Sequence, residues 1–294
     1  MIDLSNYNLT QAEHLAIESL LFQAGSDLSL TQLWMLMDQA WEAHGCDNQD
    51  PDDERLAGFY NDPVWLLNGM FIEQHALSME HRQAIANTVS TLTPQKVVDF
   101  GGGFGTLARL LANALPLAKI TICDPYPPLH GIESSKPYTN INFIPSLGGQ
   151  FFDVLVCTDV LEHIQDPLPL LATMVGAVNP GGYLLIANCF HPVIYCHLPC
   201  TFHLRYSFDQ FCRALGLEVL SPCEDSHASI YRRTKVLEPN WIQLRAMEQR
   251  SKSLFPWRQW QARHLNPWGR RAGLAFSHPL HYPRKLLRHA GTGL

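Results

Sequence analysis

The sequence predicts an α/β fold in which a mostly parallel, seven-stranded sheet carries helices on both faces. From residue 96 onward, short apolar runs alternate with helical stretches, a rhythm typical of parallel sheets whose strands are joined by helical crossovers. Before residue 96, apolar side chains recur at helical spacing, which predicts an N-terminal helical cap over residues 1–95. The sheet region is expected to cover residues 96–236, followed by a basic, Trp-rich extension over residues 237–294.

Four helices are expected in the cap. Thr10 and Glu13 have the spacing of a capping box before an apolar run, which marks the start of the first helix. A second helical pattern covers residues 30–44. Asp62-Pro63 resembles an N-cap followed by Pro at the first helical position, so a third helix is expected to start there. The fourth runs from about residue 78 to residue 92.

The elements of the sheet region follow from the same alternation. The expected strands are residues 96–100, 119–123, 141–145, 152–157, 183–188, 217–220 and 229–236. The expected helices are residues 105–114, 161–177 and 208–214. Asn179-Pro180-Gly181-Gly182 combines strong breaker residues and is expected to form a turn before the fifth strand.

The composition is that of a globular protein with a sizeable core. The 294 residues are 46% hydrophobic and 16% charged, which are ordinary values. No uncharged apolar run reaches the roughly 18 residues that span a membrane, and no basic segment precedes an apolar stretch at the N-terminus. Several of the eight cysteines lie in or next to strand-like apolar runs, where a reduced Cys packs well. We therefore expect a cytoplasmic protein.

A glycine-rich loop between the first strand and the next helix is the main functional motif. It reads Asp99-Phe100-Gly101-Gly102-Gly103-Phe104-Gly105, and such a loop lets the backbone approach a bulky ligand at the carboxyl end of a strand. The dinucleotide fingerprint Gly-x-Gly-x-x-Gly would need a third glycine where this chain has Thr106. No Gly-Lys-Ser/Thr follows, so a nucleoside triphosphate P-loop is excluded as well.

The loop resembles the first motif of the class I S-adenosylmethionine-dependent methyltransferases, acidic-x-Gly-x-Gly-x-Gly, which implies a Rossmann-like fold. The resemblance implies that Asp99, Gly101 and Gly103 border the methionine part of S-adenosylmethionine. It also implies that Asp124, which follows the second strand, binds the ribose hydroxyls. A carboxylate suits this role because it can accept hydrogen bonds from both of them.

A third match follows the fourth strand, where Asp159-Val160-Leu161-Glu162-His163 is similar to a segment of the small-molecule, ubiquinone-biosynthesis-like subgroup. Later matches at residues 179–182 and 203–216 extend the resemblance over about residues 96–222. The cofactor-binding residues that it implies are Asp99, Gly101, Gly102, Gly103, Gly105, Asp124, Pro125, Tyr126, Thr158, Asp159, Val160 and His163.

The chain departs from the family pattern in two places. The third strand ends in Phe143-Ile144-Pro145 and has no acidic residue for the adenine amine, so adenine recognition is expected to use backbone groups and Tyr126. The fourth strand is not followed by the Asn/Asp-Pro-Pro-Tyr of enzymes that methylate nucleobase amines. This absence disfavours a DNA amino-methyltransferase.

The resemblance implies catalysis mainly by alignment of a nucleophile with the S–CH₃ bond, with a base where the nucleophile is a hydroxyl. His191, after the fifth strand, is the preferred base, and His163 and His203 are the alternatives. The cap is expected to close over the acceptor, as in many enzymes of this class. Its candidate pocket residues are Tyr60, Trp65, Asn68, Glu73 and His75.

Residues 189–203 are rich in potential metal ligands. They contain Cys189, His191, Cys196, His197, Cys200 and His203, and four such side chains can surround a zinc ion. The segment has no second half with paired ligands, however. We therefore expect a loop that lines the acceptor pocket, and no metal.

Charge is distributed unevenly along the chain. The net charge is −6, yet residues 232–294 carry 13 Lys and Arg against two acids. Tryptophans among these cations are compatible with a phosphate-bearing acceptor, with nucleic acid or with peripheral contact to an anionic membrane. We expect instead that the extension packs its Trp side chains on the acidic body, whose charge disfavours nucleic acid.

The leading interpretation is an enzyme that uses S-adenosylmethionine to methylate a small-molecule acceptor, such as a sugar or another metabolite, on oxygen. One alternative is an RNA or protein methyltransferase that uses the basic extension. Another is a non-catalytic interaction protein that keeps the cofactor fold, but the intact Asp99, Gly101, Gly103 and Asp124 argue against it. The sequence does not define the acceptor or the oligomeric state.

Overall fold

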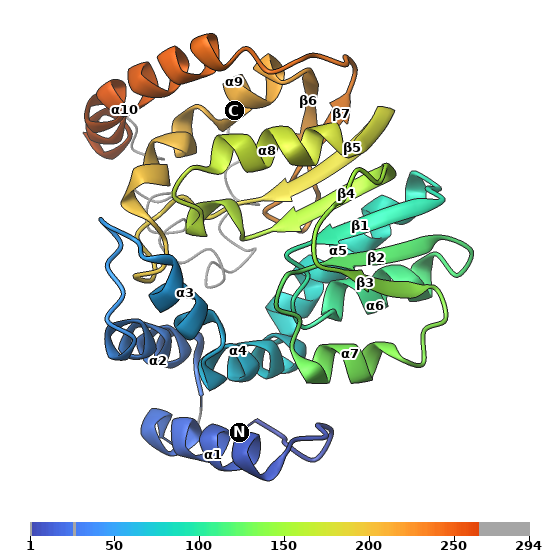
Figure 1. The fold of residues 1–294 in the computed structure, drawn as a ribbon, viewed down its shortest axis with the longest axis vertical. Coiled ribbons are helices and arrows are strands. Elements are labelled where there is room, and N and C mark those ends of the chain that lie inside the picture. The colour runs from blue at the N-terminus through green and yellow to red at the C-terminus, as the bar shows by residue number, and fades with distance from the viewer. Residues whose placement is uncertain (1, 26–27, 265–294) are drawn as a thin grey trace, which may run out of the picture.

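A seven-stranded sheet forms the centre of the computed structural model, which describes residues 2–25 and 28–264 (Figure 1). The strands are β1 (Lys96–Phe100), β2 (Lys119–Cys123), β3 (Ile141–Ile144), β4 (Phe152–Thr158), β5 (Val178–Ala187), β6 (Leu217–Pro222) and β7 (Ser229–Arg233). Their order across the sheet is β3-β2-β1-β4-β5-β7-β6. Strands β1 to β5 pair in parallel, whereas β7 is antiparallel to β5 and β6. The predicted Rossmann-like, mostly parallel sheet is confirmed.

The register brings the carboxyl ends of the central strands together. Phe100, the last residue of β1, pairs with Cys123 of β2 and with Cys157 of β4. The three strands therefore end at one edge of the sheet. The glycine loop, Asp124 and Asp159 follow these strands directly, and this edge is where open α/β sheets bind ligands.

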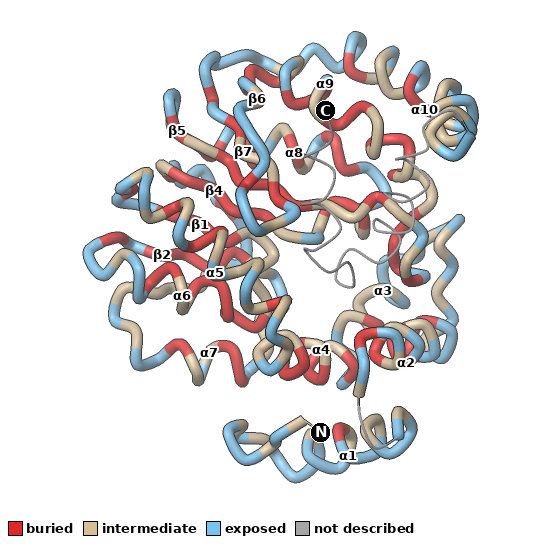
Figure 2. The backbone as a smooth tube through the Cα atoms, turned by 180° about the vertical axis from the view of Figure 1, so that it is seen from behind, coloured by how far each residue is buried: buried red, intermediate tan, exposed pale blue. Residues whose placement is uncertain are grey.

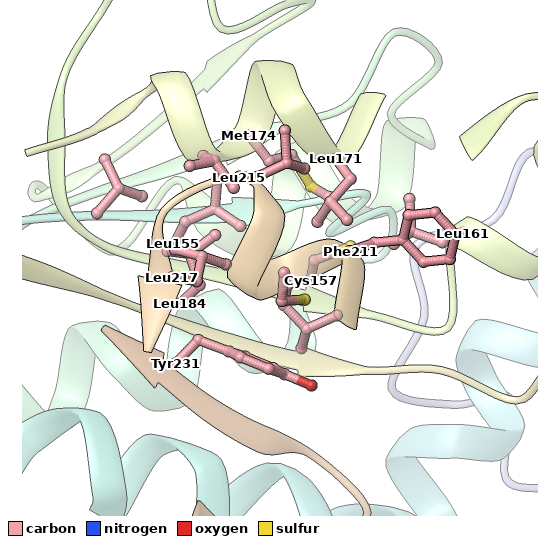
Figure 3. Close-up of a cluster of buried hydrophobic side chains, with 14 of the residues drawn as sticks. Leu155, Cys157, Leu161, Leu171, Met174, Leu184, Phe211, Leu215, Leu217 and Tyr231 are labelled. Carbon is pink, nitrogen blue, oxygen red and sulfur yellow. The ribbon is translucent and has the colours of Figure 1, made fainter. Parts of the chain in front are cut away.

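Helices cover both faces of the sheet, as the strand–helix alternation predicts. On one face, α8 (Pro167–Gly176) and α9 (Phe208–Ala214) bury a cluster that includes Leu155 and Cys157 of β4 (Figure 3). On the other face, α5 (Ala76–Thr91) and α6 (Thr106–Ala114) bury a cluster that includes Val154 and Val156. Successive residues of β4 thus point to opposite faces, and its apolar run reflects burial on both.

The cap consists of α1 (Gln11–Ala24), α2 (Leu30–Ala43), α3 (Asp53–Tyr60), α4 (Pro63–Gln74) and α5. Thr10 and Ser29 form capping boxes at the first two helices, and Asp62 caps α4 with Pro63 in its first turn. Helix α3 was not expected. Buried residues of α1 to α4, red in Figure 2, form a second core cluster with Phe104 of the glycine loop and with Ile194, Cys196 and Leu198 after β5.

Two expected boundaries in the sheet region are wrong. The helix expected over residues 161–177 is divided into a 3₁₀ turn, η1 (Leu161–His163), and α8, because Pro167 disfavours helical backbone at the residue before it. The turn expected at residues 179–182 lies inside β5, which begins at Val178 and pairs with Phe152. A register shift next to Phe152 accommodates the breaker residues, and a Cβ on Gly182 would lie 2.6 Å from the Asp153 carbonyl oxygen.

Three helices besides α3 were not expected. They are α7 (Leu129–Ser135) after β2, the 3₁₀ helix η2 (Pro199–Tyr206) and α10 (Trp241–His264). Helix α10 lies along η2 and α9 (Figure 1) and buries Leu244 and Ser251.

The basic extension docks differently from the expectation. Trp241, Trp257 and Trp260 of α10 are exposed, so the helix packs through small and aliphatic side chains rather than through tryptophans. Arg245 forms ion pairs with Asp166 of the body and with Glu248. Trp268 lies outside the described residues. No helix within residues 2–25 and 28–264 is long and apolar enough to span a bilayer.

Candidate active site

A cavity of about 670 Å³ lies at the carboxyl edge of the sheet, beneath the cap. Its volume falls in the range of about 300–1,000 Å³ that is typical of ligand pockets. One part is lined by the glycine loop, Asp99, Asp124 and Asp159. The other part is lined by aromatic and aliphatic side chains of α2, α3 and α4 and of the segment after β5. Carboxylates and an apolar chamber therefore share one cavity.

The glycine loop is packed too tightly for side chains. Gly101 has a φ of +71°, and a Cβ there would lie 2.5 Å from Cγ2 of Val160. A Cβ on Gly102 would lie 2.7 Å from Oδ2 of Asp99. Gly105 also has a positive φ, of +74°, and serves as the N-cap of α6, but it does not line the cavity. The loop thus exposes backbone to the cavity and leads into α6.

Asp124 stabilises the turn that faces the glycine loop. Its Oδ2 accepts the N–H of Gly103 at 3.0 Å, and its Oδ1 accepts the N–H of Tyr126 at 2.8 Å. Pro125 and Tyr126 also line the cavity, and Tyr126 is 59% exposed. The carboxylate is therefore held in one orientation beside the loop, and its remaining lone pairs can accept further hydrogen bonds.

Asp99 is buried directly behind the loop. Its side chain is 1% exposed, and Oδ2 has no hydrogen-bond partner among the described residues. Burial raises the pKa of Asp99 to about 7, although the positive charge of Arg82 opposes the rise. Arg82, on α5, also lines the cavity and was not identified from the sequence. It carries no motif, and only the fold brings α5 to this edge.

Asp159 directly follows β4 and has a positive φ, of +54°. His227, from the turn between β6 and β7, places its Nε2 at 2.9 Å from Oδ1 of this carboxylate. Burial alone would raise the pKa of Asp159, but His227 and then Arg82 outweigh this effect and lower it. His227 lies 68 residues from Asp159 in sequence, so sequence spacing gave no signal for the pair.

These groups fit S-adenosylmethionine, the ligand that the glycine loop predicts. The methionine part carries an ammonium and a carboxylate, and the cavity lining includes the acidic Asp99 and the cationic Arg82. The oriented Asp124 carboxylate lies at the position expected for a ribose contact. Of the cofactor-site residues predicted from the sequence, all except Gly105 line the cavity.

A second group of titratable side chains lies at the boundary between the two parts. One nitrogen each of His163 and His197 and one oxygen of Glu162 all lie within 4.8 Å of one another; we call this group the carboxylate–imidazole cluster. Burial, reinforced by His197, lowers the pKa of His163 to about 3. Burial also lowers the pKa of His197 and raises that of Glu162 well above its ordinary value. His163 was among the site residues predicted from the sequence, whereas Glu162 was not.

The cap contributes the apolar chamber. The hydroxyl of Tyr60 and the indole N–H of Trp65 are buried, line the cavity, and have no hydrogen-bond partner in the described part of the chain. Their rings lie 6.4 and 6.3 Å from the ring of His163. Asn68 lines the cavity as well. Two polar groups of the cap that lie close to the cluster therefore have no internal partner in the described part of the chain.

Two of the five predicted cap residues lie outside the cavity lining. Glu73 is bound to the body, where it accepts from the Thr106 hydroxyl at 3.0 Å and pairs with Arg109. His75 stacks on Phe71 and bonds to Ser78. Both residues fasten the cap rather than face a ligand.

Two of the three predicted bases also lie outside the lining. The carbonyl oxygen of His191 accepts from the ring of His197, but the His191 side chain does not reach the cavity. His203 is 4% exposed and bonds to Ser251 of α10. His191 and His203 do follow the fifth strand, as predicted. The direction of each side chain depends on the irregular backbone of residues 188–206, which the sequence pattern does not indicate.

Comparison with known proteins agrees with this geometry. Residues 74–275 match the methyltransferase domain family. The ubiquinone biosynthesis O-methyltransferase of Vibrio vulnificus (strain YJ016) is 26% identical over 154 residues, covering 48% of this chain and 63% of that protein. The protein of the same name from Aliivibrio fischeri (strain MJ11) is 27% identical over 139 residues, covering 42% and 56%. The chain thus spans less than two-thirds of the length of these curated relatives.

Among solved structures, an O-methyltransferase family protein from Burkholderia thailandensis has a TM-score of 0.51 at 15% identity, covering 73% of this chain and 75% of that one. This similarity shows the fold. The family match extends over more than half of the chain, from α5 of the cap through the whole sheet. The chain therefore belongs to the class I S-adenosylmethionine-dependent methyltransferases.

Proposed function

We propose that this chain transfers the methyl group of S-adenosylmethionine to an oxygen atom of a small, largely apolar acceptor. The observation that carries the proposal is the single cavity in which Asp99, Asp124 and the glycine loop face an aromatic chamber of the cap. The acceptor would lie against Tyr60 and Trp65, with its hydroxyl at the carboxylate–imidazole cluster.

The chemistry needs little from the chain beyond placement. S-adenosylmethionine supplies a methyl group that is already activated on a sulfonium. The cap excludes water, while the loop and the chamber align the acceptor oxygen with the S–CH₃ bond, and such alignment accounts for much of the rate in reactions of this kind. The O–CH₃ bond forms as the S–CH₃ bond breaks, and the hydroxyl proton leaves at the carboxylate–imidazole cluster.

The nature of the lining supports an apolar acceptor. Within residues 2–25 and 28–264, Arg82 is the one Lys or Arg that lines the cavity, and it faces carboxylates. A phosphate-bearing acceptor would require cations that this lining lacks. The relatives from Vibrio vulnificus and Aliivibrio fischeri are named as O-methyltransferases, which favours oxygen as the methylated atom.

The test combines cofactor binding with a search for methylated products. Calorimetry should show that S-adenosylhomocysteine binds, and a panel of small phenols and alcohols should yield products heavier by one methylene group in mass spectrometry. His163→Ala and His197→Ala should each reduce turnover at least tenfold, about 1.4 kcal/mol in the barrier. A loss confined to His191→Ala would return the base to His191, and failure to bind S-adenosylhomocysteine would refute the proposed function.

A further inference from the structure

We propose that Glu162, His163 and His197 form a binding site for a divalent transition-metal cation of the zinc type, at the point in the cavity where the acceptor hydroxyl would lie. This inference rests on the proposed function for the role of the metal, but the site itself is argued from the three side chains alone. It replaces the expectation, drawn from the sequence, that the chain holds no metal.

One ring nitrogen of each imidazole lies within 4.8 Å of the other and of an oxygen of Glu162. Nδ1 of His163 lies 3.0 Å from the carbonyl oxygen of Cys196, and Nδ1 of His197 lies 2.8 Å from that of His191. A carbonyl oxygen can only accept, so each Nδ1 carries a hydrogen, and in the neutral form of each ring the lone pair is on Nε2. Histidines that bind metals usually donate their other N–H to a carbonyl or carboxylate, which fixes the tautomer and the ring direction.

Glu162 supplies an oxygen that needs a cation. The residue is fully buried, and its Oε1 accepts the N–H of Cys189 at 2.7 Å. Its Oε2 is buried without a partner in the described part of the chain. A buried carboxylate oxygen without a partner is costly, and coordination to a cation would remove that cost.

The donor set favours a transition metal over magnesium. Two imidazole nitrogens and one carboxylate oxygen match catalytic zinc sites, which have three protein ligands and an open fourth position. Magnesium prefers oxygen ligands and keeps several waters. The three ligand atoms lie within 4.8 Å of one another, whereas tetrahedral zinc at about 2.1 Å from each ligand brings them to ~3.4 Å. The side chains therefore draw together when the cation binds.

Several other polar groups around the three side chains are already engaged. Asp159 is paired with His227, and the backbone carbonyls of Cys196 and His191 are used by the two imidazoles. A fourth ligand would come from the cavity, near the rings of Tyr60 and Trp65, which lie 6.4 and 6.3 Å from that of His163. An acceptor hydroxyl bound there would have a lowered pKa and would give its proton to solvent. Its oxygen would then bond to the methyl carbon as the S–CH₃ bond breaks, and S-adenosylhomocysteine would leave.

Metal binding can be tested without knowledge of the acceptor. The full chain is treated with a chelator and dialysed, and Co²⁺ is then titrated while its visible d–d absorption is followed; Zn²⁺ should displace it. We expect one Co²⁺ per chain in the wild type. His197→Ala and Glu162→Gln should each weaken Co²⁺ binding at least tenfold, whereas His14→Ala, on the outer surface of α1, should match the wild type.

Binding of S-adenosylhomocysteine, measured on every variant, separates the possible outcomes. If the variants keep their affinity for S-adenosylhomocysteine and lose Co²⁺, the metal site is supported. If the wild type binds S-adenosylhomocysteine but no Co²⁺, or if all variants bind Co²⁺ equally, the inference is refuted and the proposed function stands. If Co²⁺ binds as expected but S-adenosylhomocysteine does not, the proposed function fails while the metal site remains.

Discussion

Replacing Asp99 by Asn should stabilise the ligand-free protein at neutral pH. The carboxyl group is 1% exposed, and its Oδ2 has no partner in the described part of the chain. Burial raises its pKa from 3.8 to about 7, with Arg82 opposing the rise. An amide of the same shape removes the charge that is costly to bury while it keeps the packing behind the glycine loop.

The magnitude follows from the pKa of the folded and unfolded states. If the pKa of Asp99 is 3.8 in the unfolded chain and about 7 in the folded one, ionisation of Asp99 lowers the free energy of unfolding by up to about 4 kcal/mol, at 1.36 kcal/mol per pKa unit. Because the folded state keeps a proton that the unfolded chain loses, wild-type stability decreases as pH rises from about 4 to 7. The advantage of Asp99→Asn should therefore grow by ~1.4 kcal/mol per pH unit in that interval and level off above it.

Urea unfolding at several values between pH 5 and 8, without cofactor, measures this advantage. Asp50→Asn provides a matched control, because Asp50 is exposed and should give a difference near zero at every pH. An advantage for Asp99→Asn that does not change with pH would refute the reasoning. The same variant should bind S-adenosylhomocysteine at least tenfold more weakly, about 1.4 kcal/mol, since the carboxylate is the group proposed to face the ammonium.

The remaining predictions concern the loop, the cap and the ion pair beside them. Asp124→Ala should weaken S-adenosylhomocysteine binding at least tenfold in calorimetry, about 1.4 kcal/mol; equal affinity would remove Asp124 from the site. Gly69→Ala would place a Cβ 2.3 Å from the ring of Phe104 in the glycine loop and should lower the free energy of unfolding in urea by about 1–3 kcal/mol. The control Gly176→Ala meets nothing within 4 Å and should be neutral or stabilising. Burial lowers the pKa of His227, but Asp159 outweighs it and raises the pKa above 6.5. The ion pair therefore stabilises the fold below that pH and loses this contribution as pH rises through the raised pKa of His227. His227→Gln should lower the free energy of unfolding by about 1 kcal/mol or less at pH 6 and by less at pH 9. A cost that increased with pH would contradict this.

The part of the site that faces the methyl donor, S-adenosylmethionine, could be predicted because its residues directly follow strands. In a parallel sheet the carboxyl ends of neighbouring strands meet, so a glycine loop after β1, Asp124 after β2 and Asp159 after β4 must converge once the strands are identified. The spacing of the loop excluded dinucleotide binding, and the order of the motifs indicated the cofactor. All of this depends on local sequence and one topological rule.

The part of the site proposed for the methyl acceptor could not be predicted, because it depends on irregular backbone and on segments that are distant in sequence. His197 lies in the segment after β5, where neither helical nor strand periodicity indicates which way a side chain points. The same segment directs His203 toward α10 and leaves His191 outside the cavity lining. Arg82 and His227 come from α5 and from the turn before β7, and only the complete fold places them beside Asp159.

One short segment joins the two parts of the site. Asp159 has a φ of +54°, and this turn of the backbone directs its carboxylate toward Arg82 and His227. Glu162, in the 3₁₀ turn that follows, is buried and accepts the N–H of Cys189. The charge of Asp159 also adds to burial in raising the pKa of Glu162, whereas His227 and Arg82 lower the pKa of Asp159. With the proposed cation bound, this strand end would provide an anion beside the cofactor and a metal ligand beside the acceptor. One rigid element would then hold the two reactants close together.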